Sequence, residues 1–201
     1  MLVTAGLIVI FSLACSIGTS NDARNDNWSL SAPSYGEALG EFEGVTMYSS
    51  NGENVRGKYG LEFQCVEYVN RFYVERLGFP NLTKTGDADS YYWNAEEKGL
   101  RAYQNGGETP PEQYDILVFD GSPEDGSPGH IAIVTGVDLE TGTVSIVQQN
   151  IHARRFYVLH KYVSYDQLDL MERNGTWFVD QEPYNHPVAG WSRPIAPKET
   201  Q

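Results

Sequence analysis

Cys65 is the residue whose type and position most directly suggest chemistry. It lies near the start of residues 63–73, where apolar side chains recur at three- and four-residue steps, the spacing of one helix face. The helix should end near Leu77. A cysteine at a helix N-terminus lies near the positive end of the helix dipole, which favours the nucleophilic thiolate. The alternative for a lone cysteine is a small buried core residue.

A histidine and two amides could serve as partners of a cysteine nucleophile. His130 opens a β-branched run that predicts a strand, and a turn then leads to a second strand ending at Asn150. If these strands pair antiparallel, Gln148 or Asn150 comes within reach of His130, while Gln149 faces the opposite side. In a thiol hydrolase, the histidine takes the thiol proton and a third residue orients the imidazole.

Other elements must position these residues. Residues 87–95 predict a second short helix, with Asp87 or Asp89 as its cap and the aromatic residues 91–93 in the core. The apolar run 115–119 predicts a buried strand, and the aspartate that opens it is best explained as a turn residue.

Composition excludes several classes of function. The 201 residues, 40% of them hydrophobic, suffice for one domain, and the 20 glycines and 10 prolines indicate a body of strands and turns. A formal net charge of -13 argues against nucleic-acid binding, which requires clustered Lys and Arg. No HExxH motif or metal-ligand spacing is present, so we expect neither a bound metal nor another cofactor.

The N-terminus predicts export. Residues 1–19 contain an uncharged apolar run too short to span a bilayer, as in a signal peptide, and residues 20–34 form a polar tether before a domain over 35–196. Cys15 follows a sequence that resembles a lipoprotein cleavage box, which would make it the lipidated residue. No Lys or Arg precedes the run and Ser12 replaces the usual leucine; an ordinary secretory signal and an uncleaved membrane-associated tail are the alternatives.

Four blocks resemble, in order and spacing, the motifs of the CHAP family, the cysteine, histidine-dependent amidohydrolases/peptidases. They are residues 64–69 (QCVEYV), 114–119 (YDILVF), 129–134 (GHIAIV) and 147–150 (VQQN). Within the family, the first and last blocks and residues 172–177 are most similar to the amidase domain of glutathionylspermidine synthetase/amidase. Tyr114 departs from the pattern, since the family usually has glycine there.

The resemblance implies a role for each matching residue. Cys65 would be the nucleophile and His130 the general base and later acid. Gln148 stands where many members have glutamate, and its neutral carbonyl would weaken a thiolate–imidazolium pair by about 1–3 kcal/mol. Asn150 is the other candidate for the third role. Gln64 could join the Cys65 backbone amide in binding the oxyanion, or could simply cap the helix.

The resemblance also implies the fold and the reaction. We expect an α+β, papain-like fold in which N-terminal helices pack on an antiparallel sheet of about five or six strands. The function expected is that of an exported, monomeric amidase or peptidase acting on peptidoglycan peptides in the cell envelope, with the membrane contacted only through a lipid anchor. Two alternatives remain: an amidase for a glutathione–polyamine type of amide, and a catalytically weakened envelope binding or scaffold protein.

Overall fold

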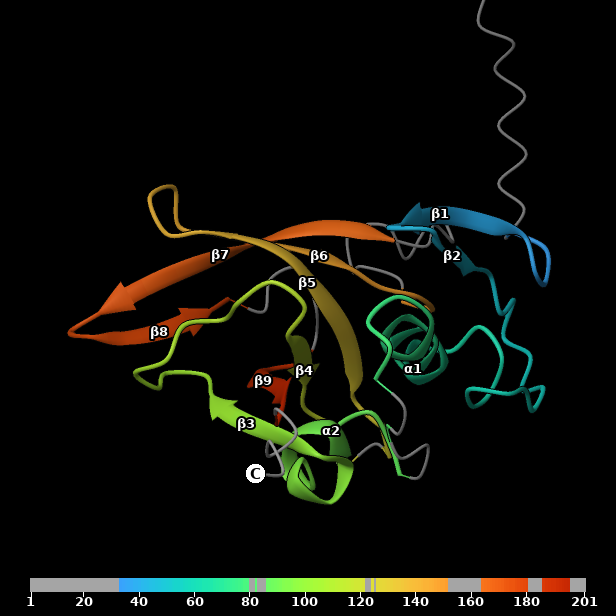
Figure 1. The fold of residues 1–201 in the computed structure, drawn as a ribbon, viewed down its shortest axis with the longest axis horizontal. Coiled ribbons are helices and arrows are strands. Elements are labelled where there is room, and N and C mark those ends of the chain that lie inside the picture. Colours follow the sequence, from blue (N-terminus) through green and yellow to red (C-terminus); the bar gives the residue numbers. More distant parts are fainter. Residues whose placement is uncertain are drawn as a thin grey trace, which may run out of the picture.

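The chain folds into one large antiparallel sheet, a separate hairpin and few helices (Figure 1). The computed structural model describes residues 33–79, 82, 86–121, 124, 126–151, 164–180 and 186–195. The large sheet has seven strands in the order β3-β9-β4-β5-β6-β7-β8, with every neighbouring pair antiparallel. These strands are β3 (Leu100–Gln104), β4 (Ile116–Phe119), β5 (His130–Asp138), β6 (Thr143–Val147), β7 (Tyr165–Arg173), β8 (Thr176–Val179) and β9 (Val188–Pro194).

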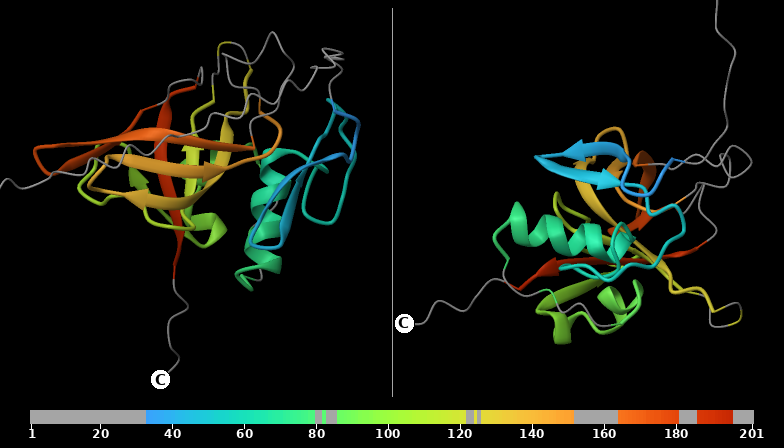
Figure 2. Two further views of the ribbon diagram at one scale, coloured as in Figure 1. Left: turned by 90° about the horizontal axis from the view of Figure 1, so that it is seen from above. Right: turned by 90° about the vertical axis from the view of Figure 1, so that its right-hand side faces the viewer.

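The two edges of this sheet are joined. The loop after β3 bonds to β8: the Gly106 amide donates to the Trp177 carbonyl at 2.6 Å, and the Trp177 amide donates to Gly107 at 2.8 Å. The side chain of Asn105 adds a pair of bonds to the backbone of Val179. The sheet therefore curls until the loop after its first strand meets its last strand. Figure 2 shows the fold from two further directions.

A two-stranded hairpin precedes the helix that begins at Cys65. Its strands β1 (Ala38–Phe42) and β2 (Val45–Tyr48) are joined by Glu43 and Gly44, whose positive φ values of 47° and 84° suit a tight hairpin turn. Tyr165 of β7 ties the hairpin to the large sheet, since its hydroxyl donates to the Glu41 carbonyl at 2.5 Å.

Helix α1 (Cys65–Glu75) packs along β5, with the hairpin against it (Figure 1). The start and approximate end predicted for this helix are confirmed. The second helix, α2 (Ser90–Trp93), is much shorter than residues 87–95 and is followed by the 3-10 turn η1 (Glu96–Lys98). None of the described helices is long and apolar enough to cross a membrane.

The sheet has an apolar core on each face because β4 and β5 are buried on both sides. Ile116 and Ile131 belong to the cluster beneath α1 and α2, whereas their neighbours Leu117 and Ala132 face the interior of the curl. Strands buried on both faces read as continuous apolar runs rather than alternating ones. The unbroken runs in the sequence therefore reflect the curled sheet.

Three expectations require correction. The sheet has seven strands rather than the about five or six implied by the resemblance, because it extends to β3 at one edge and to β8 at the other. Neither predicted aspartate caps α2 through its side chain, although Asp89 occupies the N-cap position. Of the aromatic residues expected in the core there, Tyr91 is buried but Trp93 is 62% exposed. The predicted signal peptide, residues 1–19, and residues 20–32 of the predicted tether over 20–34 lie outside the described residues.

Candidate active site

Cys65 is presented by a strained turn at the start of α1. Gln64 is the N-cap residue with an extended backbone, and Phe63 before it has φ of 62°, a left-handed conformation that is unusual for a bulky residue. The Phe63 ring packs between Tyr35 and Tyr48, at centroid distances of 4.9 and 5.0 Å. Aromatic packing therefore holds the backbone in the conformation that directs the cysteine outward from the helix start.

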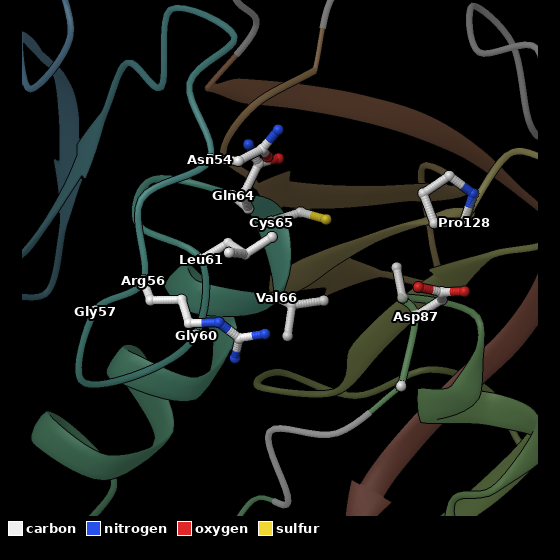
Figure 3. A pocket seen from close by; sticks show the side chains of 12 residues that line it. Asn54, Arg56, Gly57, Gly60, Leu61, Gln64, Cys65, Val66, Asp87 and Pro128 are labelled. Atoms are coloured by element: carbon white, nitrogen blue, oxygen red, sulfur yellow. The ribbon is translucent and has the colours of Figure 1, made fainter.

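The Cys65 sulfur points into a pocket of about 480 Å³ (Figure 3). Burial raises the pKa of the thiol, and the backbone amides of Ile131, Val66 and Cys65 itself only partly offset this effect. Burial thus opposes the effect expected from the helix dipole, and the net pKa of the thiol is raised. Proximity to the Ile131 amide nevertheless brings the sulfur to the residue that follows His130 in β5.

His130 is buried and held by one amide. Its Nε2 lies 3.0 Å from Oε1 of Gln148, and because that oxygen only accepts, Nε2 carries the proton and Nδ1 is left as the basic nitrogen. The ring lies 5.8 Å from that of Phe119. Burial lowers the pKa of His130 to about 4, Gln148 raises it and His186 lowers it further. The histidine is thus a neutral base at pH 7.

The described residues include no direct hydrogen bond between Cys65 and His130; the two approach through the Ile131 backbone. Catalytic hydrogen bonds are often longer before substrate binds and tighten in the complex, so the missing bond does not argue against a catalytic pair. The raised pKa of the thiol and the lowered pKa of the imidazole both favour neutral groups at pH 7 over an ion pair.

Asn150 does not share the side of Gln148, contrary to the prediction. Strand β6 ends at Val147 and Asn150 has φ of 60°, so the alternation of a strand does not extend to it. Its Oδ1 accepts from the Ser50 hydroxyl at 2.6 Å and its Nδ2 donates to Gln64. Of the two candidates for the third role, the structure brings only Gln148 to His130.

Gln64, the candidate oxyanion donor, is bonded on both ends of its amide. Its Oε1 accepts from Asn150, and its Nε2 donates to the Glu53 carbonyl at 3.3 Å. Figure 3 shows this side chain turned toward Asn54 and away from the sulfur. Serving the oxyanion would require it to leave these partners, whereas the Cys65 backbone amide already lies at the sulfur.

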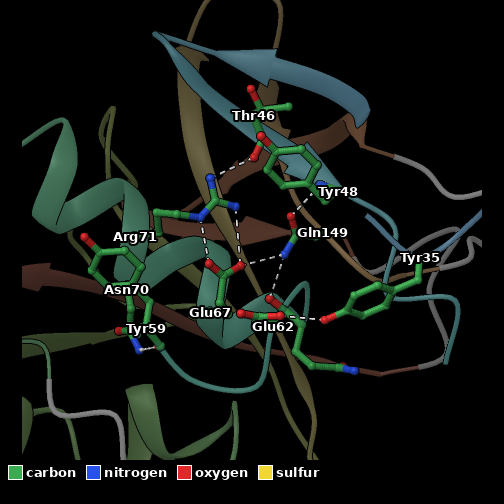
Figure 4. A network of polar contacts seen from close by, with 10 residues as sticks. Tyr35, Thr46, Tyr48, Tyr59, Glu62, Glu67, Asn70, Arg71 and Gln149 are labelled. Atoms are coloured by element: carbon green, nitrogen blue, oxygen red, sulfur yellow. Dashed lines mark hydrogen bonds and ion pairs between the residues drawn. The ribbon is translucent and has the colours of Figure 1, made fainter. Parts of the chain in front are cut away.

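A buried polar network behind the cysteine was not foreseen from the sequence (Figure 4). Glu67 and Arg71, four residues apart on α1, form an ion pair at 2.7 Å. Gln149 faces away from Gln148, as predicted, and donates to Glu67 at 3.0 Å and to the Gln64 carbonyl at 3.1 Å. The i, i+4 spacing of the charged pair was the available signal, but its burial was not visible in the sequence.

His186 was not predicted as a site residue, but it lies near the site. Its Nε2 is 3.4 Å from the Ser127 hydroxyl, and it lowers the pKa of His130. His152, His160 and Cys15 lie outside the described residues. No cluster of metal-ligating side chains occurs in the part of the chain that the structure describes.

The two residues around the second motif block have structural explanations. Asp115 is buried, accepts from the Glu112 amide at 2.8 Å and binds Arg193 through both oxygens, which agrees with the turn role expected for it. Tyr114 has φ of 72°, a conformation that glycine adopts readily. Its hydroxyl donates to Glu43 at 2.8 Å, so this departure from the family pattern affects the turn and not the chemistry.

Comparison with known proteins places these features in a family. The sequence profile of the CHAP domain matches residues 54–150, which include all four motif blocks and the Cys65, His130 and Gln148 site. Residues 54–150 belong to the CHAP domain family. The resemblance seen in the motif blocks is thereby confirmed, and the CHAP domain identifies the chain as an enzyme of the amidohydrolase/peptidase class.

One curated relative matches about two thirds of this chain. Trypanothione synthetase of Crithidia fasciculata is 28% identical over 146 residues, which are 66% of this chain and 21% of that protein. This chain thus spans about a fifth of the length of that relative.

Solved structures are more remote. An N-acetylmuramoyl-L-alanine amidase from Staphylococcus aureus matches with 18% identity and a TM-score of 0.41, covering 73% of this chain and 36% of that one. Ly7917 matches with 18% identity and a TM-score of 0.36, covering 66% and 54%. At these TM-scores the overlaps add nothing to the description of the fold or the site.

Proposed function

We propose that this CHAP domain hydrolyses amide bonds with Cys65 as nucleophile and His130 as general base. The observation that carries the proposal is the buried Nε2 contact of His130 with Gln148, at 3.0 Å, which leaves Nδ1 as the base, while the backbone amide of the next residue, Ile131, lies at the Cys65 sulfur. A thiol hydrolase requires a hydrogen bond that orients the imidazole through one nitrogen and a thiol near the other nitrogen.

The proposed reaction begins from the neutral pair. His130 Nδ1 accepts the thiol proton while the sulfur attacks the carbonyl carbon, and the Cys65 backbone amide donates to the developing oxyanion. The carbon–nitrogen bond then breaks as His130 returns the proton to the leaving amine, which departs and leaves a thioester. A water molecule, deprotonated by His130, attacks the thioester carbon and releases the acid and the thiol.

Gln148 determines how strongly the imidazolium is stabilised in this mechanism. Its carbonyl orients the imidazole but brings no negative charge to stabilise the imidazolium that forms during proton transfer. Burial disfavours both charged forms, because it raises the pKa of Cys65 and lowers that of His130. Proton transfer concerted with attack on the substrate avoids a free ion pair and fits these shifts.

We further propose peptidoglycan peptides as the substrate and the bacterial cell envelope as the location. The N-terminal apolar run and Cys15 support export, with or without a lipid anchor, and amide bonds between amino acids abound in that compartment. A signal peptide over residues 1–19, a tether over 20–34 and a domain over 35–196 remain part of this proposal.

A second candidate substrate is a small peptide–polyamine amide. Similarity to a protein named trypanothione synthetase favours it, and the net charge of -13 would attract a cationic amide. The third candidate, a weakened binding or scaffold protein, is favoured by the uncharged Gln148 at the histidine.

Digestion of purified peptidoglycan, with mass spectrometry of the soluble fragments, tests the proposal. The full chain should release fragments with new amino and carboxyl termini, whereas Cys65→Ala should release none and His130→Ala almost none. Thermal unfolding of each variant should show an intact fold. Release of fragments by the Cys65→Ala protein would refute the mechanism, and hydrolysis of a glutathione–diamine amide alone would select the second substrate.

A further inference from the structure

The pocket that holds the Cys65 sulfur has one cationic and one anionic side chain in its lining. Arg56 lies on the wall that precedes α1, and Asp87 lies on the wall that leads to α2. Figure 3 shows the two charged groups on opposite sides of the pocket, with Val66 and the sulfur between them. The other lining residues carry no charge: Asn54, Gly57, Gly60, Leu61, Gln64, Gly86, Ala88 and Pro128.

Both charged residues are exposed, and hydrogen bonds hold the backbone that carries them. Arg56 pairs with Leu61 in an isolated β-bridge, and the Gly57 amide donates to the Gly60 carbonyl at 2.8 Å. The Asp87 carbonyl accepts from the Ser90 hydroxyl at 2.5 Å, and the next residue, Ala88, is buried. Within the described residues, neither the Arg56 guanidinium nor the Asp87 carboxylate forms an ion pair.

We propose that Arg56 and Asp87 select peptide amides that carry both a free carboxylate and a free ammonium group. This inference rests on the proposed hydrolysis at Cys65. A planar guanidinium binds a carboxylate through two parallel hydrogen bonds, and a carboxylate binds an ammonium group through a charge-assisted bond. With opposite charges on opposite walls, a substrate that bears both groups is oriented with its amide near the sulfur.

The charge and size of the site limit the class of substrate further. The chain has a net charge of -13, so its average field disfavours a substrate carboxylate, and Arg56 supplies a local cation for it in the pocket. A volume of about 480 Å³ accommodates a small peptide-like ligand and not a folded protein segment. Short zwitterionic peptide amides therefore fit better than long neutral chains.

A matched set of four amides tests the inference. One scissile peptide amide is prepared with both termini free, with an acetylated amine, with an amidated carboxylate and with both blocked, and kcat/KM is measured for each. The natural chain should prefer the doubly free amide over the doubly blocked one by about 100-fold, about ten-fold for each charged contact. Stem-peptide and γ-glutamyl–diamine versions of the set distinguish the two sources of this chemistry.

Two variants assign each preference to its residue. Arg56→Gln should reduce the preference for a free over an amidated carboxylate about ten-fold, and Asp87→Asn should reduce the preference for a free over an acetylated amine by the same factor. Arg101→Gln and Asp169→Asn, two exposed residues on β3 and β7 outside the pocket, serve as charge-matched controls.

The outcomes separate the inference from the proposed function. Equal rates on all four amides would overturn the role of Arg56 and Asp87 while leaving hydrolysis at Cys65 intact. Absence of hydrolysis of every amide would overturn the proposed function. The inference is then decided by calorimetry with the Cys65→Ala protein, where the doubly free amide should still bind about 100-fold more tightly than the blocked one. Equal dissociation constants in that experiment would overturn it.

Discussion

Gln148 and Gln149 follow each other after β6 and are equally buried, at 0% and 1% exposure, but they bond to opposite parts of the molecule. Gln148 contacts the imidazole of His130. Gln149 bonds to Glu67 and to the Gln64 carbonyl of α1, and it accepts from the Tyr48 amide of β2 at 2.7 Å. One side of this short segment contacts the proposed catalytic base, and the other side binds the segment to the helix that carries Cys65.

The difference shows how a neutral residue can occupy a catalytic position and remain well oriented. Gln148 offers His130 only one carbonyl oxygen, whereas Gln149 makes three hydrogen bonds to two elements. We infer that Gln148 serves the reaction through His130, whereas Gln149 stabilises the fold by joining this segment to α1 and β2. If so, variants on the Gln149 side should change the free energy of unfolding most, and variants at Gln148 should change the rate most.

The largest effect should come from breaking the ion pair beneath Gln149. Arg71→Leu leaves the buried Glu67 carboxylate without its cation, which should lower the free energy of unfolding by about 3–5 kcal/mol. Arg76→Leu is the matched control, since Arg76 is the C-cap residue of the same helix and meets Glu43 at the same 2.7 Å but is 48% exposed. That pair should contribute less than about 1 kcal/mol.

Urea denaturation of both variants measures this contrast directly. Equal losses for Arg71→Leu and Arg76→Leu would mean that burial does not distinguish the two pairs. It would also remove the reason for assigning a stabilising role to the Gln149 side of the segment.

The next largest effect separates rate from stability at the two glutamines. Gln148→Leu removes the acceptor of the His130 Nε2 proton, so the imidazole loses its orientation, and kcat should fall about 100-fold. Gln149→Leu should lower kcat of the folded protein by less than about three-fold while reducing stability. Steady-state kinetics on an amide substrate, corrected for the folded fraction, should show this asymmetry. A larger loss of kcat for Gln149→Leu would reverse our assignment.

Gln148→Glu should change how the free energy of unfolding depends on pH. The folded pKa of His130 is about 4, below the unfolded value of about 6.5, so between these limits the unfolded chain binds more protons. This contribution to stability is complete above pH 6.5 and is lost as the pH falls toward 4, by up to about 3 kcal/mol. A carboxylate at position 148 should raise the pKa of His130 and reduce this loss.

Unfolding free energies at pH 4.5 and pH 7 test the effect, with His186→Gln as the control that removes the neighbouring histidine. Gln148→Glu should also raise activity, because it stabilises the imidazolium. An unchanged difference between the two pH values, together with unchanged activity, would show that Gln148 does not communicate with His130.

The sequence predicted the parts of this site that depend on residue type and local pattern. The helix at Cys65, the strand at His130 and the opposite facing of Gln148 and Gln149 follow from the periods of helices and strands. The pKa of Cys65 did not follow, because the helix dipole is a local feature whereas burial of the sulfur depends on packing against β5.

The number of strands failed for a similar reason. Strand β3 joins the sheet through β9, about ninety residues later in the chain, and the closing bonds join Asn105 to Val179, 74 residues later. The partly polar sequences of β3 and β7 contain no continuous apolar run that would identify them. Long-range pairing of weakly apolar strands is not visible in one sequence.

The smallest predicted effect concerns Asn150, the residue at which strand alternation failed. Asn150→Ala removes the hydrogen bonds to Ser50 and Gln64. Alanine also tolerates the backbone φ of 60° less well than asparagine does. The variant should therefore lower the free energy of unfolding by about 1–2 kcal/mol. Asn150→Gly loses the same bonds but relieves the backbone, and it should be the milder variant by about 1 kcal/mol. Both should retain the pH dependence assigned to His130. A change in that dependence would mean that Asn150, and not Gln148 alone, acts on the histidine.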